Sequence, residues 1–291
     1  MTTTTTTTKQ LLPINQTFYF RWNYKRRCIT YNNVPIAGLL PILQNLFYSN
    51  YSYYDAIKQE RNLLNKPTSS SIEVLSIHDV NNLVKHSIDS GKNVDRLIGI
   101  TIKLYQKYNL PKDIFINKTY YDNACKENLI SDEAKRKTKF YWNRKRNNVI
   151  SLIIKFWWFL KKFNLKPIYH ELPVGNLNLR IATRIDVVCQ NENNQKWVLI
   201  EIKTGFDRYY NCSNGYMDIP LQNFKNSIKN QHQLQLLMNQ TLFEYTYPTC
   251  SIDTSFILQF HDQGITTYPL ELIFLNYKQQ IINKIDTRSS S

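Results

Sequence analysis

The sequence has few glycines and lacks any long apolar run. Only 7 of its 291 residues are glycine, and Asn, Lys, Ile and Tyr are frequent, a bias typical of an AT-rich coding genome. No segment reaches about 18 uninterrupted apolar residues, so no transmembrane helix is expected. A methionine and a run of threonines begin the chain, without the apolar core of a signal peptide or the arginines of a transit peptide. We expect residues 1–17 and 287–291 to be disordered tails.

Cysteine is also sparse, and its spacing excludes two common classes of small domain. The chain has 5 cysteines and no C-x-x-C pair, so the spacing of a zinc site is missing. An odd number of scattered cysteines argues against a disulfide framework. We expect the thiols to be reduced and the protein to be intracellular. The 5 histidines show no metal-binding spacing either.

Positive charge is abundant. The formal net charge is +15 and the pI is about 9.5. Such a balance favours a polyanionic partner, with nucleic acid first and an anionic membrane second. The alternative interpretation is that lysine is simply frequent in an AT-rich genome.

Two short apolar strands flank a polar turn in the second half of the chain. Residues 184–188 and 197–205 are rich in Val and Ile, and a cluster of Asn, Gln and Glu separates them. Because strand side chains alternate between two faces, Glu201 and Lys203 share one face and the apolar side chains share the other. If the strands pair as a hairpin, Asp186 lies beside Glu201.

Two carboxylates and an ammonium on one small patch predict a cation site. Close carboxylates repel each other, and one of them tends to keep its proton. A divalent cation removes this penalty, and Mg²⁺ typically takes one or two carboxylates together with water and phosphate oxygens. A neighbouring lysine stabilises negative charge that develops during a reaction. The predicted substrate is a phosphodiester. The alternative is an exposed hairpin with a solvated Glu–Lys pair.

These residues resemble a known signature. Asp186, followed 15 positions later (201 − 186) by Glu201-Ile202-Lys203, resembles the D-x(n)-(D/E)-x-K motif of the PD-(D/E)XK nuclease superfamily. The run from Glu201 to Gly205 is similar to its RecB-like, phage lambda exonuclease-like branch. The resemblance implies an α/β, restriction-endonuclease-like fold, a mixed sheet flanked by helices, and DNA cleavage with Mg²⁺ or Mn²⁺. Ile185 stands where the family has its proline.

The resemblance also implies roles for individual residues. Asp186 and Glu201 are expected to bind the metal, joined by the main-chain carbonyl of Ile202. Glu171 is the best match to a further acidic ligand that the branch often has upstream. Lys203 is expected to handle the attacking water.

A catalytic glutamine is expected on the helix after the lysine strand. The sequence predicts this helix over residues 223–243 and offers Gln231, Gln233 and Gln235. The family's Gln-Leu pattern favours Gln233, whereas helical spacing favours Gln231 or Gln235, so the choice stays open. The tyrosine that often follows this glutamine by four residues is missing.

Additional strands are predicted around the motif. Residues 167–174 and 177–181 read as strands joined by a Gly-Asn turn, and residues 255–260 and 265–270 read as a second hairpin. The long segment 206–227 is predicted to be a loop that leaves the end of the lysine strand, where it could contact DNA.

The region before residue 131 is predicted to be mostly helical. Residues 18–31 interleave aromatic and basic side chains, which suits either a hairpin with its rings inward or stacking on bases. Residues 51–54 are predicted to be loop. Residues 76–108 predict two helices separated near Gly91.

Residues 131–163 predict one helix with two different halves. Acidic residues open it, a basic block follows, and the last half is apolar and aromatic. We expect the apolar half to pack on the sheet and the basic half to contact phosphates. The predicted nucleic-acid contacts, including one on the motif strand, are Arg136, Lys139, Arg144, Lys145, Arg146 and Arg184. A basic amphipathic helix lying on a membrane is the main alternative.

The sequence therefore predicts a metal-dependent deoxyribonuclease, with an exonuclease in DNA repair, recombination or replication as the specific expectation. An N-terminal region over residues 18–130 precedes a nuclease core over residues 131–286. The alternatives are a nucleic-acid-binding protein that keeps the fold without the chemistry, and a basic membrane-surface protein. No small-molecule cofactor is predicted.

Overall fold

A computed structural model describes most of the chain. The described residues are 20–23, 28–49, 51–64, 77–143, 148–205, 207–261 and 264–288. Most of the two predicted tails lies outside them. At the C-terminal end, helix α9 runs to Arg288, two residues into the segment predicted as a tail.

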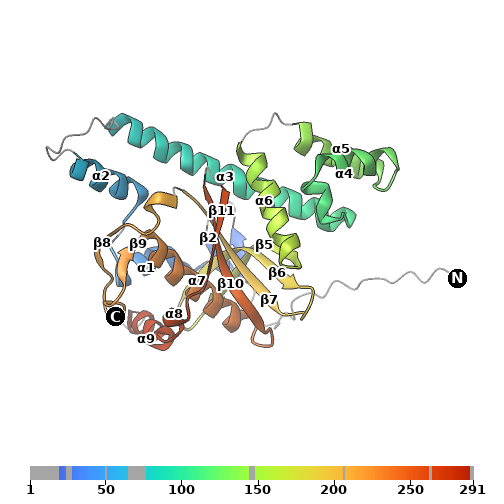
Figure 1. The fold of residues 1–291 in the computed structure, drawn as a ribbon. Coiled ribbons are helices and arrows are strands. Elements are labelled where there is room, and N and C mark those ends of the chain that lie inside the picture. The colour runs from blue at the N-terminus through green and yellow to red at the C-terminus, as the bar shows by residue number, and fades with distance from the viewer. Residues whose placement is uncertain are drawn as a thin grey trace.

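A six-stranded mixed sheet is the centre of the molecule (Figure 1). Its strand order is β11-β10-β7-β6-β4, and β5 pairs with β6 as well. β7 and β10 run parallel, as do β4 and β6, and the other pairs are antiparallel. The strands are β4 (Ala37–Gly38), β5 (Leu165–Asn176), β6 (Ile181–Asn191), β7 (Trp197–Thr204), β10 (Ile252–His261) and β11 (Gly264–Pro269).

Short strands lie outside this sheet. β1 and β2 form an antiparallel hairpin to which β3 adds, and β8 pairs with β9 within the segment predicted as a loop. Their bounds are β1 (Phe20–Asn23), β2 (Cys28–Tyr31), β3 (Val34–Pro35), β8 (Ser213–Tyr216) and β9 (Lys225–Ser227). The predicted hairpin over residues 18–31 is confirmed for its described residues.

Helices cover both faces of the sheet (Figure 1). One face carries α1, α7, α8 and α9, and the other carries α3 and α6, with α4 and α5 beyond them. The helices are α1 (Leu39–Phe47), α2 (Tyr53–Leu64), α3 (Ile77–Tyr108), α4 (Lys118–Lys126), α5 (Asp132–Asn143), α6 (Asn148–Lys162), α7 (Ile228–Thr246), α8 (Leu272–Leu275) and α9 (Lys278–Arg288), with short 3₁₀ turns at η1 (Lys112–Phe115) and η2 (Asp207–Tyr209).

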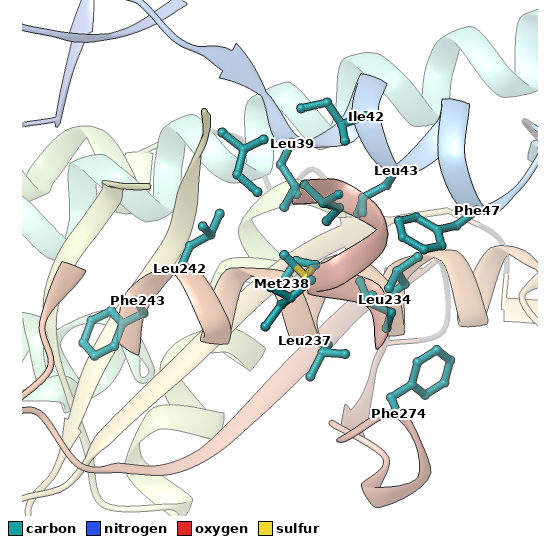
Figure 2. Close-up of a cluster of buried hydrophobic side chains, with 14 of the residues drawn as sticks. Leu39, Ile42, Leu43, Phe47, Leu234, Leu237, Met238, Leu242, Phe243 and Phe274 are labelled. Atoms are coloured by element: carbon teal, nitrogen blue, oxygen red, sulfur yellow. The ribbon is translucent and has the colours of Figure 1, made fainter. Parts of the chain in front are cut away.

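α7 is the central helix of the first face. Its N-cap Ser227 accepts a hydrogen bond from the Asn230 amide, which satisfies one of the free N–H groups at the helix start. Figure 2 shows its apolar side chains against those of α1 and α8, each buried large side chain contributing roughly 1.5–3 kcal/mol. The labelled residues are Leu39, Ile42, Leu43 and Phe47 of α1, Leu234, Leu237, Met238, Leu242 and Phe243 of α7, and Phe274 of α8.

α3 crosses the other face as one continuous helix, so the prediction of two helices separated near Gly91 was wrong. The glycines of α3 permit close approach rather than a break. A Cβ at Gly91 would lie 2.4 Å from the Thr204 hydroxyl oxygen on β7, and one at Gly99 would lie 2.5 Å from the His170 ring on β5. The missing side chains let α3 lie directly on the strands that carry the motif.

Three further predictions are corrected. Residues 131–163 form two helices, α5 and α6, on either side of residues 144–147, which lie outside the described part. Residues 177–180 form the turn between β5 and β6 rather than a strand. Tyr53 and Tyr54 begin α2 rather than belonging to a loop.

The predicted α/β class, with a mixed sheet flanked by helices, is confirmed. The two regions predicted on either side of residue 130 pack together. β4 pairs with β6, and side chains of α1 and α3 belong to the same two cores as the strands.

Candidate functional site

The motif hairpin forms as predicted, and its two strands separate where the charged residues stand. β6 and β7 pair from Gln190–Trp197 to Val187–Ile200. Continuing this register by one residue places Asp186 opposite Glu201, on the face of Val188 and Leu199. Side chains directly opposite each other in this way have Cβ atoms roughly 4.5–5.5 Å apart. Beyond the last pair, the Ile202 amide donates to the Asp186 carboxylate at 2.7 Å.

Glu201 is the most enclosed member of the group. Only 3% of the residue is exposed. Its Oε1 accepts hydrogen bonds from Lys203 Nζ at 2.7 Å and Gln235 Nε2 at 2.6 Å, and its Oε2 accepts one from Asn239 Nδ2 at 2.8 Å. Lys203 Nζ also donates to Gln235 Oε1 at 2.9 Å. The carboxylate and the ammonium are thereby fixed in position by α7.

Asp186 shows the electrostatic cost of this arrangement. Burial raises the pKa of the Asp186 carboxyl well above its usual value, and the neighbouring Glu201 charge raises it further. The Lys203 ammonium and the Ile202 amide act in the opposite direction without reversing the shift. The site therefore favours an additional positive charge near Asp186.

The glutamine at the site is Gln235. It hydrogen-bonds to both Glu201 and Lys203, whereas the other two candidates, Gln231 and Gln233, have their hydrogen bonds elsewhere. Gln233 points to the far side of α7, where it donates to the Pro269 carbonyl and accepts from the Glu271 amide. Gln231 donates to Asn226 Oδ1. The Gln-Leu pattern favoured Gln233 and helical spacing favoured Gln231 or Gln235; of these three candidates, Gln235 is the one that lies at the motif.

Asn239 is a site residue that the sequence reasoning missed. It lies one turn after Gln235, fully buried, and its Oδ1 has no hydrogen-bond partner. Gln231, Gln235 and Asn239 follow one another at four-residue spacing, so they form a row of side-chain amides on one face of α7. The four-residue spacing of these amides is visible in the sequence and could have pointed to Asn239.

Glu171 forms an ion pair with Arg184. Its Oε1 lies 2.6 Å from Arg184 Nη1, and the Arg184 guanidinium stacks 3.9 Å from the centre of the Trp22 ring. Glu171 also holds a left-handed backbone (φ +54°) in the middle of β5. Glu171 thus forms an ion pair with Arg184, and the flanking pairs His170–Val187 and Leu172–Ile185 place its backbone opposite Asp186.

A second missed group reaches the site from α3. His170 Nε2 lies 3.0 Å from Asp95 Oδ1, and the Asp95 charge contributes to the raised pKa of Asp186. Gly91, Asp95 and Gly99 follow at four-residue spacing on α3, so one helix face brings two close contacts and a carboxylate to β5 and β7.

His232 lies beside the lysine. Its Nδ1 is 3.1 Å from the Tyr210 hydroxyl, and the ring is half-buried. Burial and the Lys203 charge lower the pKa of His232 well below its usual value. The imidazole is therefore neutral at pH 7.

The basic block is distant from this group. Arg136 and Lys139 are exposed on α5, while Arg144, Lys145 and Arg146 lie outside the described residues. α5 begins beside the end of α3, where Glu133 pairs with Lys107 at 3.1 Å. Lys107 is 16 residues (107 − 91) beyond Gly91, or about 24 Å along a helix. The start of α5 thus lies about seven base-pair steps of duplex from the Gly91–Thr204 contact.

In the part of the chain that the structure describes, no three His, Cys, Asp or Glu side chains come together as a metal-binding group. The oxygen donors at the motif are the two carboxylates of Asp186 and Glu201. None of the described helices is both long and apolar enough to span a bilayer.

No family model matches the chain, and no curated protein matches it. A solved structure described as "Crystal structure of SSO0001" aligns with 78% of this chain and 84% of its own, at 12% identity and a TM-score of 0.24.

Proposed function

We propose that this protein is a metal-dependent nuclease that hydrolyses phosphodiester bonds in DNA, with a restriction-endonuclease-like core. The single observation that carries the proposal is the proximity of the Asp186 carboxylate, which accepts the Ile202 amide, to Glu201 just beyond the last β6–β7 pair, with Lys203 hydrogen-bonded beside them. An ordinary surface hairpin has no reason to bury Glu201 and to half-bury Asp186 and Lys203 beside it.

The residues fit a hard divalent cation. Their donors are carboxylate oxygens, and two carboxylates are what Mg²⁺ typically takes from a protein that leaves its remaining positions to water and phosphate. The raised pKa of Asp186 is the penalty that such a cation relieves. The unpartnered Asn239 Oδ1 provides an additional buried acceptor behind Glu201. The Ile202 carbonyl remains a proposed ligand.

The side chains divide the work. A cation held by Asp186 and Glu201 would polarise the scissile phosphate and make a bound water more acidic. Lys203 places its ammonium beside the attacking water and next to the charge that develops on the phosphate. Gln235 holds both Glu201 and Lys203, so it positions the two groups.

Cleavage of end-labelled linear DNA and closed circular DNA with Mg²⁺ or Mn²⁺ tests the proposal. We expect degradation of linear DNA that EDTA stops. Asp186→Asn, Glu201→Gln and Lys203→Met should each lower the rate by at least about 100-fold, the scale of a lost catalytic group.

A matched control is available on the surface. Lys118 and Asp122 on α4 form an ion pair at 2.7 Å, the same length as the Lys203–Glu201 pair, but their side chains are 53% and 44% exposed. Lys118→Met and Asp122→Asn should cleave like wild type. Wild-type cleavage rates in all three site variants would contradict the assignment of the catalytic residues.

A further inference from the structure

A groove between α6 and the edge strand β11 has chemistry that the proposed cleavage does not use. Its volume is about 940 Å³, at the upper end of the roughly 300–1,000 Å³ of ligand sites. The side chains that matter for its chemistry are Lys155, Trp158, Lys162, Phe163, Asp207 and His261.

One wall is an exposed aromatic shelf. Trp158 is 54% exposed and Phe163 is 41% exposed. The shelf is anchored from behind, because the Phe159 ring lies 4.8 Å from that of Phe163 and 5.8 Å, edge to face, from that of Phe256 on β10. These contacts hold the Phe163 ring, and a ring that is held in place yet open to solvent loses little entropy when a flat ligand lies against it.

Two ammonium groups border the shelf. Lys162 Nζ lies 5.5 Å from the centre of the Trp158 ring and 5.6 Å from that of Phe163. Lys155 Nζ lies beside Gly264 at the start of β11, so close that a Cβ on Gly264 would be 3.1 Å from it. Asp207, whose carboxylate accepts a hydrogen bond from the Tyr268 hydroxyl at 3.4 Å, supplies one opposing charge.

The groove begins near the catalytic lysine. Gln259 of β10 pairs with Lys203 of β7, and His261, which lines the groove, comes two residues later. One strand spacing across and two residues along place the His261 and Lys203 backbones about 8 Å apart. Asp207, at another side of the groove, follows Lys203 by four residues. Lys203 faces α7 and the groove lies on the α6 side of the sheet, so a strand leaving the site would reach the groove around the ends of β7 and β10.

From the shelf, the two cations and this proximity, we propose that the groove binds an unpaired segment of the substrate nucleic acid. One base stacks on Trp158, and phosphates contact Lys155 and Lys162. Single strands expose base faces that aromatic side chains stack on, whereas a duplex keeps its bases stacked within the helix. This proposal rests on the proposed function.

Binding of short DNA in EDTA separates stacking from charge. The probes are a fluorescent oligothymidylate of about 12 nucleotides, an abasic strand of equal length, and phosphatidylserine vesicles. Trp158→Ala should weaken oligothymidylate binding by about 5- to 150-fold, the scale of one lost base stack, and leave abasic binding unchanged. Lys162→Gln should weaken both strands and reduce the salt slope by about 0.7. Tyr216→Ala, which removes an exposed ring (66%) on β8, is the matched control and should bind like wild type.

The outcomes are distinct. Trp158→Ala binding oligothymidylate as well as wild type, or losing both strands equally, overturns the groove as a stacking site. Vesicle binding that depends on Trp158 while oligothymidylate binding does not would assign the shelf to a membrane instead. Because EDTA prevents cleavage, binding and cleavage are measured separately. If the protein binds through Trp158 but cuts no DNA, the proposed nuclease function is contradicted and the groove proposal stands. If it cuts DNA but does not need Trp158 for binding, only the groove proposal is contradicted.

Discussion

At the scale of single residues, Asp186 both contacts the backbone of the neighbouring strand and takes part in the electrostatics of the site. Its carboxylate accepts a hydrogen bond from the Ile202 amide beyond the last β6–β7 pair, and it lies near the charge of Glu201. Burial and Glu201 raise its pKa, so the folded protein keeps this proton to a higher pH than the unfolded chain does. Without metal, the protein should lose stability as pH rises from the unfolded value near 4 through the folded pKa.

Asp186→Asn should remove this loss. The asparagine oxygen still accepts the Ile202 amide, but no proton is released. In EDTA, the variant should match wild type below about pH 4 and exceed it at neutral pH. Urea unfolding across this range measures the difference, with Asp122→Asn as the control carboxylate. Parallel profiles for wild type and Asp186→Asn would contradict the raised pKa.

The glutamines of α7 should separate function from stability. Gln235→Ala removes the contacts to Glu201 and Lys203 and should lower the cleavage rate by about 10- to 100-fold. Gln233→Ala leaves the Pro269 carbonyl and the Glu271 amide without their partner and should cost about 1–3 kcal/mol of unfolding free energy. Cleavage rates and denaturation curves measured on both variants test this prediction. A Gln235→Ala cleavage rate equal to that of wild type would show that Gln235 has no role in cleavage.

At the scale of secondary structure, the position of α3 depends on residues that have no side chain. Alanine normally stabilises a helix by about 1 kcal/mol relative to glycine. At Gly99, however, the new Cβ would meet the His170 ring at 2.5 Å. Gly99→Ala should therefore destabilise the protein, because overpacking typically costs about 1–3 kcal/mol.

A double-mutant cycle checks this explanation. His170→Ala removes the ring, so Gly99→Ala should become neutral or stabilising in that background. Lys92→Ala, an exposed substitution on the same helix, controls for helix propensity. The same cost in both backgrounds would mean that the close approach is not the reason for the glycine.

The motif hairpin was predictable because strand geometry is simple. A side-chain period of two and a short polar turn place Asp186, Glu201 and Lys203 on one face without any tertiary information. The alternation that predicted the hairpin of β10 and β11 worked for the same reason.

Helices were less predictable, because tertiary contacts decide which face matters. Gln231, Gln233 and Gln235 are all buried, so the pattern along α7 does not distinguish the side toward the sheet. Gly91 resembles a helix break in the sequence, but the structure uses it for contact with Thr204. The Glu171–Arg184–Trp22 contacts join residues far apart in the chain, and no local pattern reports them.

At the scale of the whole molecule, the charge of +15 is distributed over separate surfaces. α5 begins about 24 Å from the Gly91–Thr204 contact, so its cations can meet only a long substrate. We predict that Arg136→Gln with Lys139→Gln reduces the slope of log K against log salt by about 1.8 on long duplex DNA. On oligonucleotides shorter than about seven base pairs, the slope should not change. Equal effects on both lengths would place these side chains nearer to the site than the fold does.

The account depends most on one claim, that Asp186 and Glu201 bind a common cation. Titration with Mn²⁺, followed by the electron paramagnetic resonance of the free ion, measures this without DNA or cleavage. Wild type and Asp122→Asn should bind the ion equally, and Asp186→Asn and Glu201→Gln should each bind it at least about 10-fold more weakly. Equal affinity in wild type and both site variants would contradict the claim.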